Sequence, residues 1–366
     1  MKNIIFIIPN IERGGIEKNL IILSNYFIKK DYDVKIIFLK ISSEIKKKLR
    51  KKITLIKCKK IINTKFVPPR ILNSINCFLY ILINHKFDKK QVILSFQDHP
   101  ISILISKIKK IPCIIRIANH PVGSLKYFNN KLQFLIKINI KKFFYYFSSG
   151  IICNSKSSAF FFKKLYKNKK IITIYNPSKK SDNFNNNTNR KNQIVSVGRL
   201  QNQKNFYGLI KAFDLIKDKL KKTKLVIVGS GSEYKKLKQI TKKLKLINRV
   251  NFLKYQNPIK IIKSSKLFVL NSLWEGLPNI LIECHNCKTP VLSSDCLSGP
   301  REILQNGKLG YLTPVNNERL LAKKIIYIFK NYEFAKKKSE LAWEKLHRFD
   351  EIGQCRKFEI FLNKFI

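Results

Sequence analysis

Acidic residues are scarce in this chain. Among its 366 residues, Lys and Arg number 74 whereas Asp and Glu number 22, so the formal net charge is +52. Clustered cations can neutralise nucleic-acid phosphates or attach a protein to an anionic membrane surface. The lysines are scattered through all expected elements, however, and no nucleic-acid-binding module is recognisable. We therefore expect no nucleic-acid partner, attribute much of the charge to a composition rich in Lys, Ile and Asn, and keep an anionic membrane surface as a candidate partner.

Long apolar runs are also missing. No stretch reaches the roughly 18 uninterrupted apolar residues of a membrane-spanning helix. The first ten residues hold one lysine and a short apolar run that ends at Pro9, without the length or cleavage site of a signal peptide. We therefore expect a cytoplasmic protein, with peripheral binding to the inner face of the cell membrane as an option.

The eight cysteines form no disulfide framework. Cys284 and Cys287 have the spacing of a zinc or redox pair, but no second Cys/His pair matches it, so the signal is weak. Free cysteines in apolar runs behave as small hydrophobic residues. We expect the pair to pack within a helix.

The length allows two domains, each with its own core. Residues 178–192 are polar, rich in asparagine and without apolar periodicity, which predicts an interdomain linker. On either side, in 1–177 and 193–342, short β-branched runs alternate with amphipathic segments, as in parallel α/β sheets. The expected strands are 4–8, 34–39, 53–57, 92–96, 111–117, 150–154, 171–175, 193–197, 225–228, 250–253, 267–270 and 310–314.

Polar residues follow several of these strands. Gly14 and Gly15 lie between the first strand and a helix, an arrangement that brings backbone close to a ligand, although a plain turn would look the same. Asn119 and His120 follow the fifth strand, at the edge where open α/β sheets bind ligands. His120 is the better acid–base or hydrogen-bonding candidate, and the alternative is a turn cap. Arg116 is close behind, and Asp98 and His99 are weaker candidates.

Residues 131–147 alternate lysines with Leu, Ile, Phe and Tyr. As a helix, this segment is basic and strongly aromatic, and such a helix can lie on an anionic membrane. The alternative is a core helix with a lysine-rich outer face. We expect one face to pack in the core and membrane contact to be an added property.

Two glutamates eight positions apart follow the apolar run at 267–270. Gly276 and Pro278 predict a turn, and Asn279 begins a helical pattern. Glu275 would then lie at the mouth of the helix and Glu283 about two turns along it, near the same face. Since a helix N-terminus attracts phosphate, the two carboxylates could hold a sugar and a ribose on either side of a diphosphate. The alternative is an amphipathic helix with surface glutamates.

This stretch resembles the signature of retaining, nucleotide-sugar-dependent glycosyltransferases of family four. The pattern S-x-x-E-G-x-P-x-x-x-x-E is matched by Ser272, Glu275, Gly276, Pro278 and Glu283. The family has the GT-B fold, in which two Rossmann-like domains with parallel sheets face a cleft. The run SGPREI at 298–303 resembles the subgroup that extends bacterial surface polysaccharide, lipopolysaccharide or lipid-linked oligosaccharides.

The chain departs from the family pattern in two places. The usual E-A-M-A is here Glu283-Cys284-His285-Asn286, and the usual glycine before P-V is replaced by Lys288-Thr289. In this fold the helical tail, about 343–366, is expected to pack back on the first domain.

The resemblance also implies roles for individual residues. Gly198-Arg199-Leu200 and Lys204 resemble the family's G-R-L…K element, so Arg199 and Lys204 would stabilise the charge that grows on the leaving phosphate. Glu275 would bind the donor sugar, and His120 is the fourth catalytic candidate. The substrate-binding candidates are Gly14, Gly15, Asn119, Gly231, Gly276, Leu277, Pro278, Asn279 and Glu283.

Gly231 belongs to a G-x-G loop that lacks the third glycine of a dinucleotide fingerprint, so it is no NAD site by itself. In the family this loop lies beside the nucleotide base. Tyr255, Gln256 and Asn257 are expected near the base by position alone.

The implied reaction is transfer of a hexose or N-acetylhexosamine from a UDP-sugar to a saccharide hydroxyl, with retention. The family usually needs no metal, and we expect no cofactor. The expected acceptor, by analogy, is a growing polyprenyl-linked glycan. Two alternatives stay open: a GT-B-fold sugar-nucleotide epimerase and a basic nucleic-acid-binding protein.

Overall fold

The computed structural model describes residues 2–11, 14–64, 66–88, 90–97, 99–123, 131–180, 189–254 and 256–366. The chain divides into two compact units. Unit 1 comprises 1–118, 128–177 and 351–366, and unit 2 comprises 119–127 and 178–350. The expected ranges differ from this division in three places. Residues 119–127 group with unit 2, and so does the range 178–192 of the expected linker. The segment that returns to unit 1 begins at Glu351, not near residue 343.

The sheet of unit 1 has seven parallel strands in the order β5-β3-β1-β6-β7-β8-β9. The chain builds outward from β1 in one direction and then from β6 in the other, so the switch point lies between these two strands. The strands are β1 Asn3–Ile7, β3 Asp33–Phe38, β5 Thr54–Lys57, β6 Gln91–Ser95, β7 Cys113–Ile117, β8 Gly150–Cys153 and β9 Ile171–Thr173, and a separate two-stranded sheet pairs β2 Asn10–Ile11 with β4 Lys40–Ile41.

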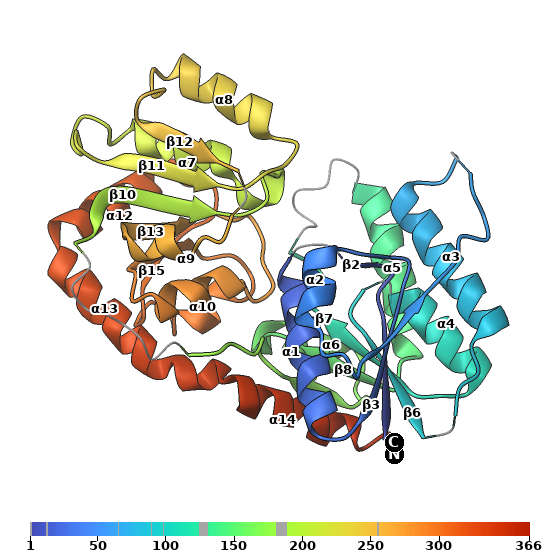
Figure 1. The fold of residues 1–366 in the computed structure, drawn as a ribbon. Helices are drawn as coiled ribbons and strands as arrows, with labels where there is room; N and C mark the ends of the chain where they lie inside the picture. The colour runs from blue at the N-terminus through green and yellow to red at the C-terminus, as the bar shows by residue number, and fades with distance from the viewer. Residues whose placement is uncertain are drawn as a thin grey trace. The chain divides into compact units, whose positions relative to one another are not determined.

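Helices cover both faces of this sheet (Figure 1). Alternate strand residues point to opposite faces: Ile4 and Phe6 join the cluster beneath α1 and α14, whereas Ile5 and Ile7 join the cluster beneath α3 to α6. The helices are α1 Gly15–Lys29, α2 Ser43–Lys48, α3 Pro69–Asn84, α4 His99–Lys109, α5 Lys131–Tyr146, α6 Lys156–Leu165 and α14 Glu351–Leu362.

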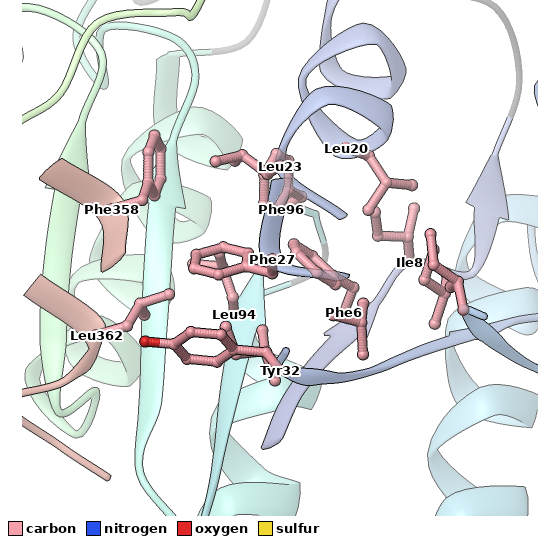
Figure 2. Packing of buried hydrophobic residues seen from close by; sticks show 14 of the residues in the cluster. Phe6, Ile8, Leu20, Leu23, Phe27, Tyr32, Leu94, Phe96, Phe358 and Leu362 are labelled. Carbon is pink, nitrogen blue, oxygen red and sulfur yellow. The ribbon is translucent and has the colours of Figure 1, made fainter. Parts of the chain in front are cut away.

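The last helix belongs to the core of unit 1, although it is more than 300 residues from the first. Phe358 and Leu362 of α14 lie beside Phe27 and Tyr32 (Figure 2). The Tyr26 hydroxyl donates to Glu359 Oε2 at 2.7 Å. Apolar packing together with this polar contact fixes α14 against α1.

The sheet of unit 2 has six parallel strands in the order β12-β11-β10-β13-β14-β15, which repeats the pattern of unit 1 with its switch point between β10 and β13. The strands are β10 Lys191–Val197, β11 Lys224–Val228, β12 Val250–Leu253, β13 Ser265–Leu270, β14 Val291–Ser294 and β15 Tyr311–Thr313. The helices are η2 Asn202–Lys204, α7 Phe206–Asp214, α8 Tyr234–Lys243, α9 Ile259–Lys263, α10 Asn279–Asn286, α11 Pro300–Ile303, α12 Glu318–Lys330, α13 Tyr332–Glu344 and η3 Lys345–Phe349.

The end of the expected linker is an ordered part of unit 2. β10 begins at Lys191, and the Arg190 guanidinium donates to the carbonyl oxygens of Lys263, Cys287 and Lys288 at 2.8–2.9 Å. These carbonyls stand at the C-terminal ends of α9 and α10, where a cation is favoured. Residues 181–188 of the expected linker lie outside the described ranges.

All eight cysteines are buried with free thiols. Cys284 lies inside α10 as expected, whereas Cys287 directly follows the last residue of this helix. Among the helices described, none combines the length and apolarity needed to cross a membrane. The predicted α/β architecture with two parallel sheets is confirmed.

Candidate functional site

Two loops meet at the switch point of the second sheet. One follows β10 and the other follows β13, and the carboxyl edge at such a point is where open α/β sheets bind ligands. The Leu273 N–H donates to the Gln203 carbonyl at 2.8 Å, and Gln203 Nε2 donates to the Trp274 carbonyl at 2.9 Å. Asn271 Nδ2 also donates to the Asn205 carbonyl at 3.1 Å. These bonds fix the two loops against each other.

Lys204 and Glu275 form an ion pair across these loops. Lys204 Nζ lies 2.5 Å from Glu275 Oε1, and the side chains are 16% and 7% exposed. Ser272 Oγ donates to the same oxygen at 2.6 Å. The Lys204 stem passes over Gly198, since a Cβ added there would lie 3.3 Å from three stem carbons. A pair this buried is held in one geometry, and losing one partner would leave the other charge uncompensated.

The segment after β14 supports the glutamate loop. Ser298 Oγ donates to the Gly276 carbonyl at 3.1 Å, and Ser294 Oγ donates to the Ser272 carbonyl at 2.5 Å. Gly299 has φ of +84°, and a Cβ there would lie only 2.0 Å from the Gly276 oxygen. Only glycine fits such a position. The S-G-P-R run therefore buttresses the backbone of the Glu275 loop, a role that the sequence pattern did not indicate.

The α10 helix begins at Asn279, as predicted. Pro278, at the N-cap, has no side-chain acceptor to cap the helix, so the helix presents its N-terminus beside the Glu275 loop. Leu277 is buried, and Glu283 is half-buried within α10.

Arg199 and Gly231 lie on neighbouring loops. The backbones of these loops touch, because a Cβ at Gly231 would lie 2.4 Å from the Leu200 carbonyl oxygen and the Leu200 N–H donates to the Ser230 carbonyl at 2.9 Å. The Arg199 side chain is exposed and makes no ion pair with any residue that the structure describes. The structure thus joins Lys204 to Glu275 directly and leaves Arg199 outside that pair.

The loop after β7 joins the same cluster within unit 2. Asn119 pairs with Gly276 in an isolated antiparallel bridge, and a Cβ added to Gly123 would lie 3.0 Å from Trp274 Cβ. His120 Nδ1 accepts the Val122 N–H at 3.3 Å, and burial lowers the pKa of His120. At neutral pH the imidazole is therefore neutral, and with Nδ1 accepting, its proton resides on Nε2.

Other candidates lie in unit 1. Gly14 directly precedes α1 and Gly15 is its first residue; Glu17 Oε2 would lie 2.7 Å from a Cβ at Gly14, so its carboxylate folds over this glycine. His99 begins α4, where its Nδ1 lies 2.9 Å from Ser95 Oγ and burial lowers its pKa to about 3.

Arg116 lies on β7, within the predicted strand 111–117. It is 1% exposed, its guanidinium lies 5.0 Å from the centroid of the Phe96 ring, and its Nη2 donates to Asn176 Oδ1. Its Nε and Nη1 atoms have no hydrogen-bond partner in the described chain. Arg116 is thus a core residue of unit 1 rather than a side chain that a ligand could reach. Asp98 and Tyr255 lie outside the described residues.

Comparisons with known proteins bear on these residues. The family model described as "Glycosyl transferases group 1" matches residues 178–345. An uncharacterized glycosyltransferase of Methanocaldococcus jannaschii is 46% identical over 30% of this chain and 28% of its own length. The chain covers less than half the length of each of the first curated relatives that it matches.

Two further comparisons span the chain. The Campylobacter jejuni protein GalNAc-alpha-(1->4)-GalNAc-alpha-(1->3)-diNAcBac-PP-undecaprenol alpha-1,4-N-acetyl-D-galactosaminyltransferase is 26% identical over 98% of this chain and 95% of its own. The crystal structure of Anabaena HepE, in complex with UDP and glucose, aligns over the whole of both chains with a TM-score of 0.78 and 19% identity. Such neighbours confirm the predicted GT-B fold. Residues 178–345, which contain Lys204, Glu275 and Gly299, are similar to the group 1 glycosyl transferases.

Proposed function

We propose that the protein transfers a hexose or N-acetylhexosamine from a UDP-sugar to a saccharide hydroxyl, with retention of the anomeric configuration. The observation that carries this proposal is the Lys204–Glu275 pair, 2.5 Å apart at the switch point of the second sheet. A cation, an acid and a helix N-terminus in one loop cluster form the combination that a sugar diphosphate requires.

Lys204 and Arg199 are assigned to the leaving diphosphate. When the bond between the anomeric carbon and the phosphate oxygen breaks, negative charge grows on that oxygen. Lys204 already points into the cluster but is held by Glu275, so it exchanges this carboxylate for a phosphate oxygen when the donor binds. Arg199 is exposed and without an ion pair among described residues, so no existing partner must be broken before it contacts phosphate.

Glu275, His120 and Asn119 are assigned to the transferred sugar. Glu275 Oε1 accepts from Lys204 and Ser272 in this state, and a sugar hydroxyl would replace Lys204 as donor. His120 is assigned through its neutral imidazole, which can form hydrogen bonds without carrying a charge. The backbone around Gly276, Leu277, Pro278 and Asn279 is assigned to sugar or phosphate, Glu283 to the ribose hydroxyls, and Gly231 to the neighbourhood of the base.

The proposal needs no enzyme nucleophile and no metal. The acceptor oxygen bonds to the anomeric carbon on the face that the diphosphate leaves, and the acceptor proton passes to a leaving phosphate oxygen. Catalysis then rests on positioning and on electrostatic stabilisation of the diphosphate.

The acceptor is proposed to be a polyprenyl-linked saccharide of a surface polysaccharide. The full-length similarity to a protein whose name specifies an undecaprenol-linked glycan supports this choice. Gly14 and Gly15 of unit 1 are assigned to the acceptor side, and the site of action is the cytoplasmic face of the cell membrane.

A donor screen tests the proposal. Binding of the correct UDP-sugar raises the apparent unfolding temperature by mass action, and NMR of the disaccharide product reports whether the anomeric configuration is kept. An inverted product would refute retention. Epimerised donor in the absence of acceptor would instead identify a sugar-nucleotide epimerase, and salt-sensitive nucleic-acid binding without UDP affinity would refute the enzyme altogether.

A further inference from the structure

The α5 helix of unit 1 carries a row of apolar side chains on its outer surface. Its exposed apolar residues recur at intervals of three and four positions, which places them on one face of a helix. We call this the α5 face; it consists of Leu132, Leu135, Ile136, Ile140, Phe143 and Tyr146, which are between 49% and 67% exposed.

Other residues of α5 pack this helix against the core of unit 1. Ile138 and Tyr145 are 7% and 9% exposed, and Tyr145 packs in the cluster beneath α3 to α6. At 100° per residue, these two positions lie roughly opposite the centre of the α5 face. The apolar character of the face is therefore not explained by folding of unit 1, and a row of this size marks an interaction surface.

The charge around this face points to the kind of partner. From residue 99 to residue 181 the sequence holds 17 Lys and Arg residues and no Asp or Glu. At the chain's average of 22 acidic residues in 366, this stretch of 83 residues would hold about five, whereas its basic content equals the average. A general excess of lysine in the chain does not account for a local loss of acids. The partner is therefore anionic.

Lysines also border the α5 face directly. By helical geometry, Lys137 and Lys142 lie on opposite borders of the row. At its C-terminal end, Lys169 Nζ lies 5.8 Å from the centroid of the Tyr146 ring, and Lys107 Nζ lies 5.7 Å from that of Phe147. Apolar side chains flanked by lysines and aromatic rings are suited to a bilayer surface. The apolar side chains and the lysine methylene groups enter the apolar layer, and the lysine ammonium groups stay at the lipid headgroups.

We propose that the α5 face docks on the surface of an anionic lipid bilayer. A second copy of this chain would bring the same positive charge to the contact, so charge disfavours it as the occupant. The neighbouring α4, which packs against α5 (Figure 1), adds exposed Leu104 and Ile108. This inference rests on the proposed function only in the reason for docking, which is that the enzyme gains access to a lipid-linked acceptor. Docking itself needs neither donor nor acceptor.

Co-sedimentation with vesicles tests the proposal. The wild-type protein is expected to bind equimolar phosphatidylcholine and phosphatidylglycerol vesicles and to bind pure phosphatidylcholine much more weakly. Replacing Leu135→Ser together with Phe143→Ser should weaken binding by more than tenfold. Replacing Lys137→Gln and Lys142→Gln should weaken it about fivefold for each lysine, as expected for a basic residue near an anionic surface.

Two matched control pairs separate the α5 face from general properties of the chain. Ile352→Ser with Ile360→Ser removes two side chains that are 70% and 55% exposed on α14 of the same unit. Lys238→Gln with Lys242→Gln removes two exposed lysines of α8. Both control pairs should bind vesicles like the wild type, and circular dichroism should show the same helix content in all variants.

Three results would overturn the proposal: α5 variants that bind like the wild type, control pairs that lose as much binding as the α5 variants, or a lipid-free dimer that the α5 variants disrupt. The last would make a second copy the occupant. UDP-sugar hydrolysis in detergent-free solution should be unchanged by the α5 variants. Loss of vesicle binding with retained hydrolysis thus separates this inference from the proposed function.

Discussion

The two sheets share one strand pattern, which β9 extends in unit 1, but they differ in how a cation near the carboxyl edge is placed. In unit 2, Lys204 is paired with Glu275 and keeps 16% of its side chain exposed. In unit 1, Arg116 is 1% exposed and its guanidinium lies against the Phe96 ring. Burial lowers the pKa of Arg116 to about 10. The same topology therefore offers one edge with a reachable, paired cation and another whose cation is sealed in the core. Topology supplies the edge, and local residues decide what that edge can bind.

The largest expected effect is the loss of the reachable cation. Lys204→Ala should lower the rate of UDP-sugar turnover by about 100- to 1,000-fold, the usual effect of removing one group that stabilises a developing oxyanion. The control is Lys238→Ala, which removes an exposed lysine of α8 in the same unit. Steady-state kinetics of both variants provide the measurement. Equal rates for Lys204→Ala and the wild type would contradict a catalytic role for the cation at the edge of unit 2.

The next effect concerns the support of the Glu275 loop. Gly299→Ala should destabilise unit 2 by about 3 kcal/mol, because the added Cβ collides with the Gly276 carbonyl and the positive φ is strained. Gly307→Ala is the matched control: φ there is +91° and a Cβ would meet only one atom, at 3.9 Å. It should lose only the backbone term, about 1 kcal/mol.

Intrinsic fluorescence resolves this effect by unit, because both tryptophans, Trp274 and Trp343, lie in unit 2. Denaturant unfolding followed by fluorescence should shift more for Gly299→Ala than for Gly307→Ala. Similar shifts for the two variants would show that the contact between Gly299 and Gly276 carries no energy.

A buried histidine in each unit makes both units sensitive to acid. Burial lowers the pKa of His99 in unit 1 and of His285 in unit 2 to about 3, with Arg116 and Lys141 near the first and Arg348 near the second. The unfolded chain therefore binds more protons than the folded protein between about pH 3 and 6.5, so stability falls as pH falls through this window. From pH 7 to pH 5, each histidine should lower the free energy of unfolding by about 2 kcal/mol.

His285→Met isolates the contribution of unit 2. Neither ring nitrogen of His285 has a hydrogen-bond partner in the described chain, so the substitution breaks no polar contact. Fluorescence-monitored unfolding of this variant should lose about 2 kcal/mol less than the wild type between pH 7 and pH 5. The exposed His347 serves as the control through His347→Gln, and an equal acid response in all three proteins would disprove the assignment.

The smallest effect is expected at an exposed ion pair near the same site. Arg301 donates through Nε to Asp295 Oδ1 at 2.9 Å, but its side chain is 61% exposed. Arg301→Ala should change the free energy of unfolding by about 0.5 kcal/mol or less, because water screens such pairs. A loss comparable with that of Gly299→Ala would mean that the surface of unit 2 contributes more than its buried contacts do.

Much of the fold followed from local patterns. β12 spans Val250–Leu253 as predicted, and β1 differs from its predicted range by one residue at each end, because buried strands consist of short β-branched runs. The pattern did not indicate α4, which begins at His99 with Pro100 in its first turn. Proline is tolerated in the first turn of a helix, so Pro100 is compatible with a helix that begins at His99.

Many residues of the site were predicted from the sequence, whereas most contacts among them were not. Glu275 and Lys204 were each expected from motif and spacing, and their direct contact agrees with convergence at one edge. The buttress from Ser298 and Gly299 and the bridge from Asn119 to Gly276 depend on contacts between distant segments. No local periodicity records such contacts, so only the folded chain reveals them.

The binding of UDP itself tests the central claim most directly, since it needs no knowledge of the sugar or acceptor. Isothermal titration should give the same Kd for the wild type and for Lys238→Ala, and a Kd at least about tenfold weaker for Lys204→Ala, the loss of one charge-assisted contact to phosphate. Unchanged UDP affinity in Lys204→Ala, or no UDP binding by any of the three proteins, would contradict a diphosphate site at Lys204 and Glu275.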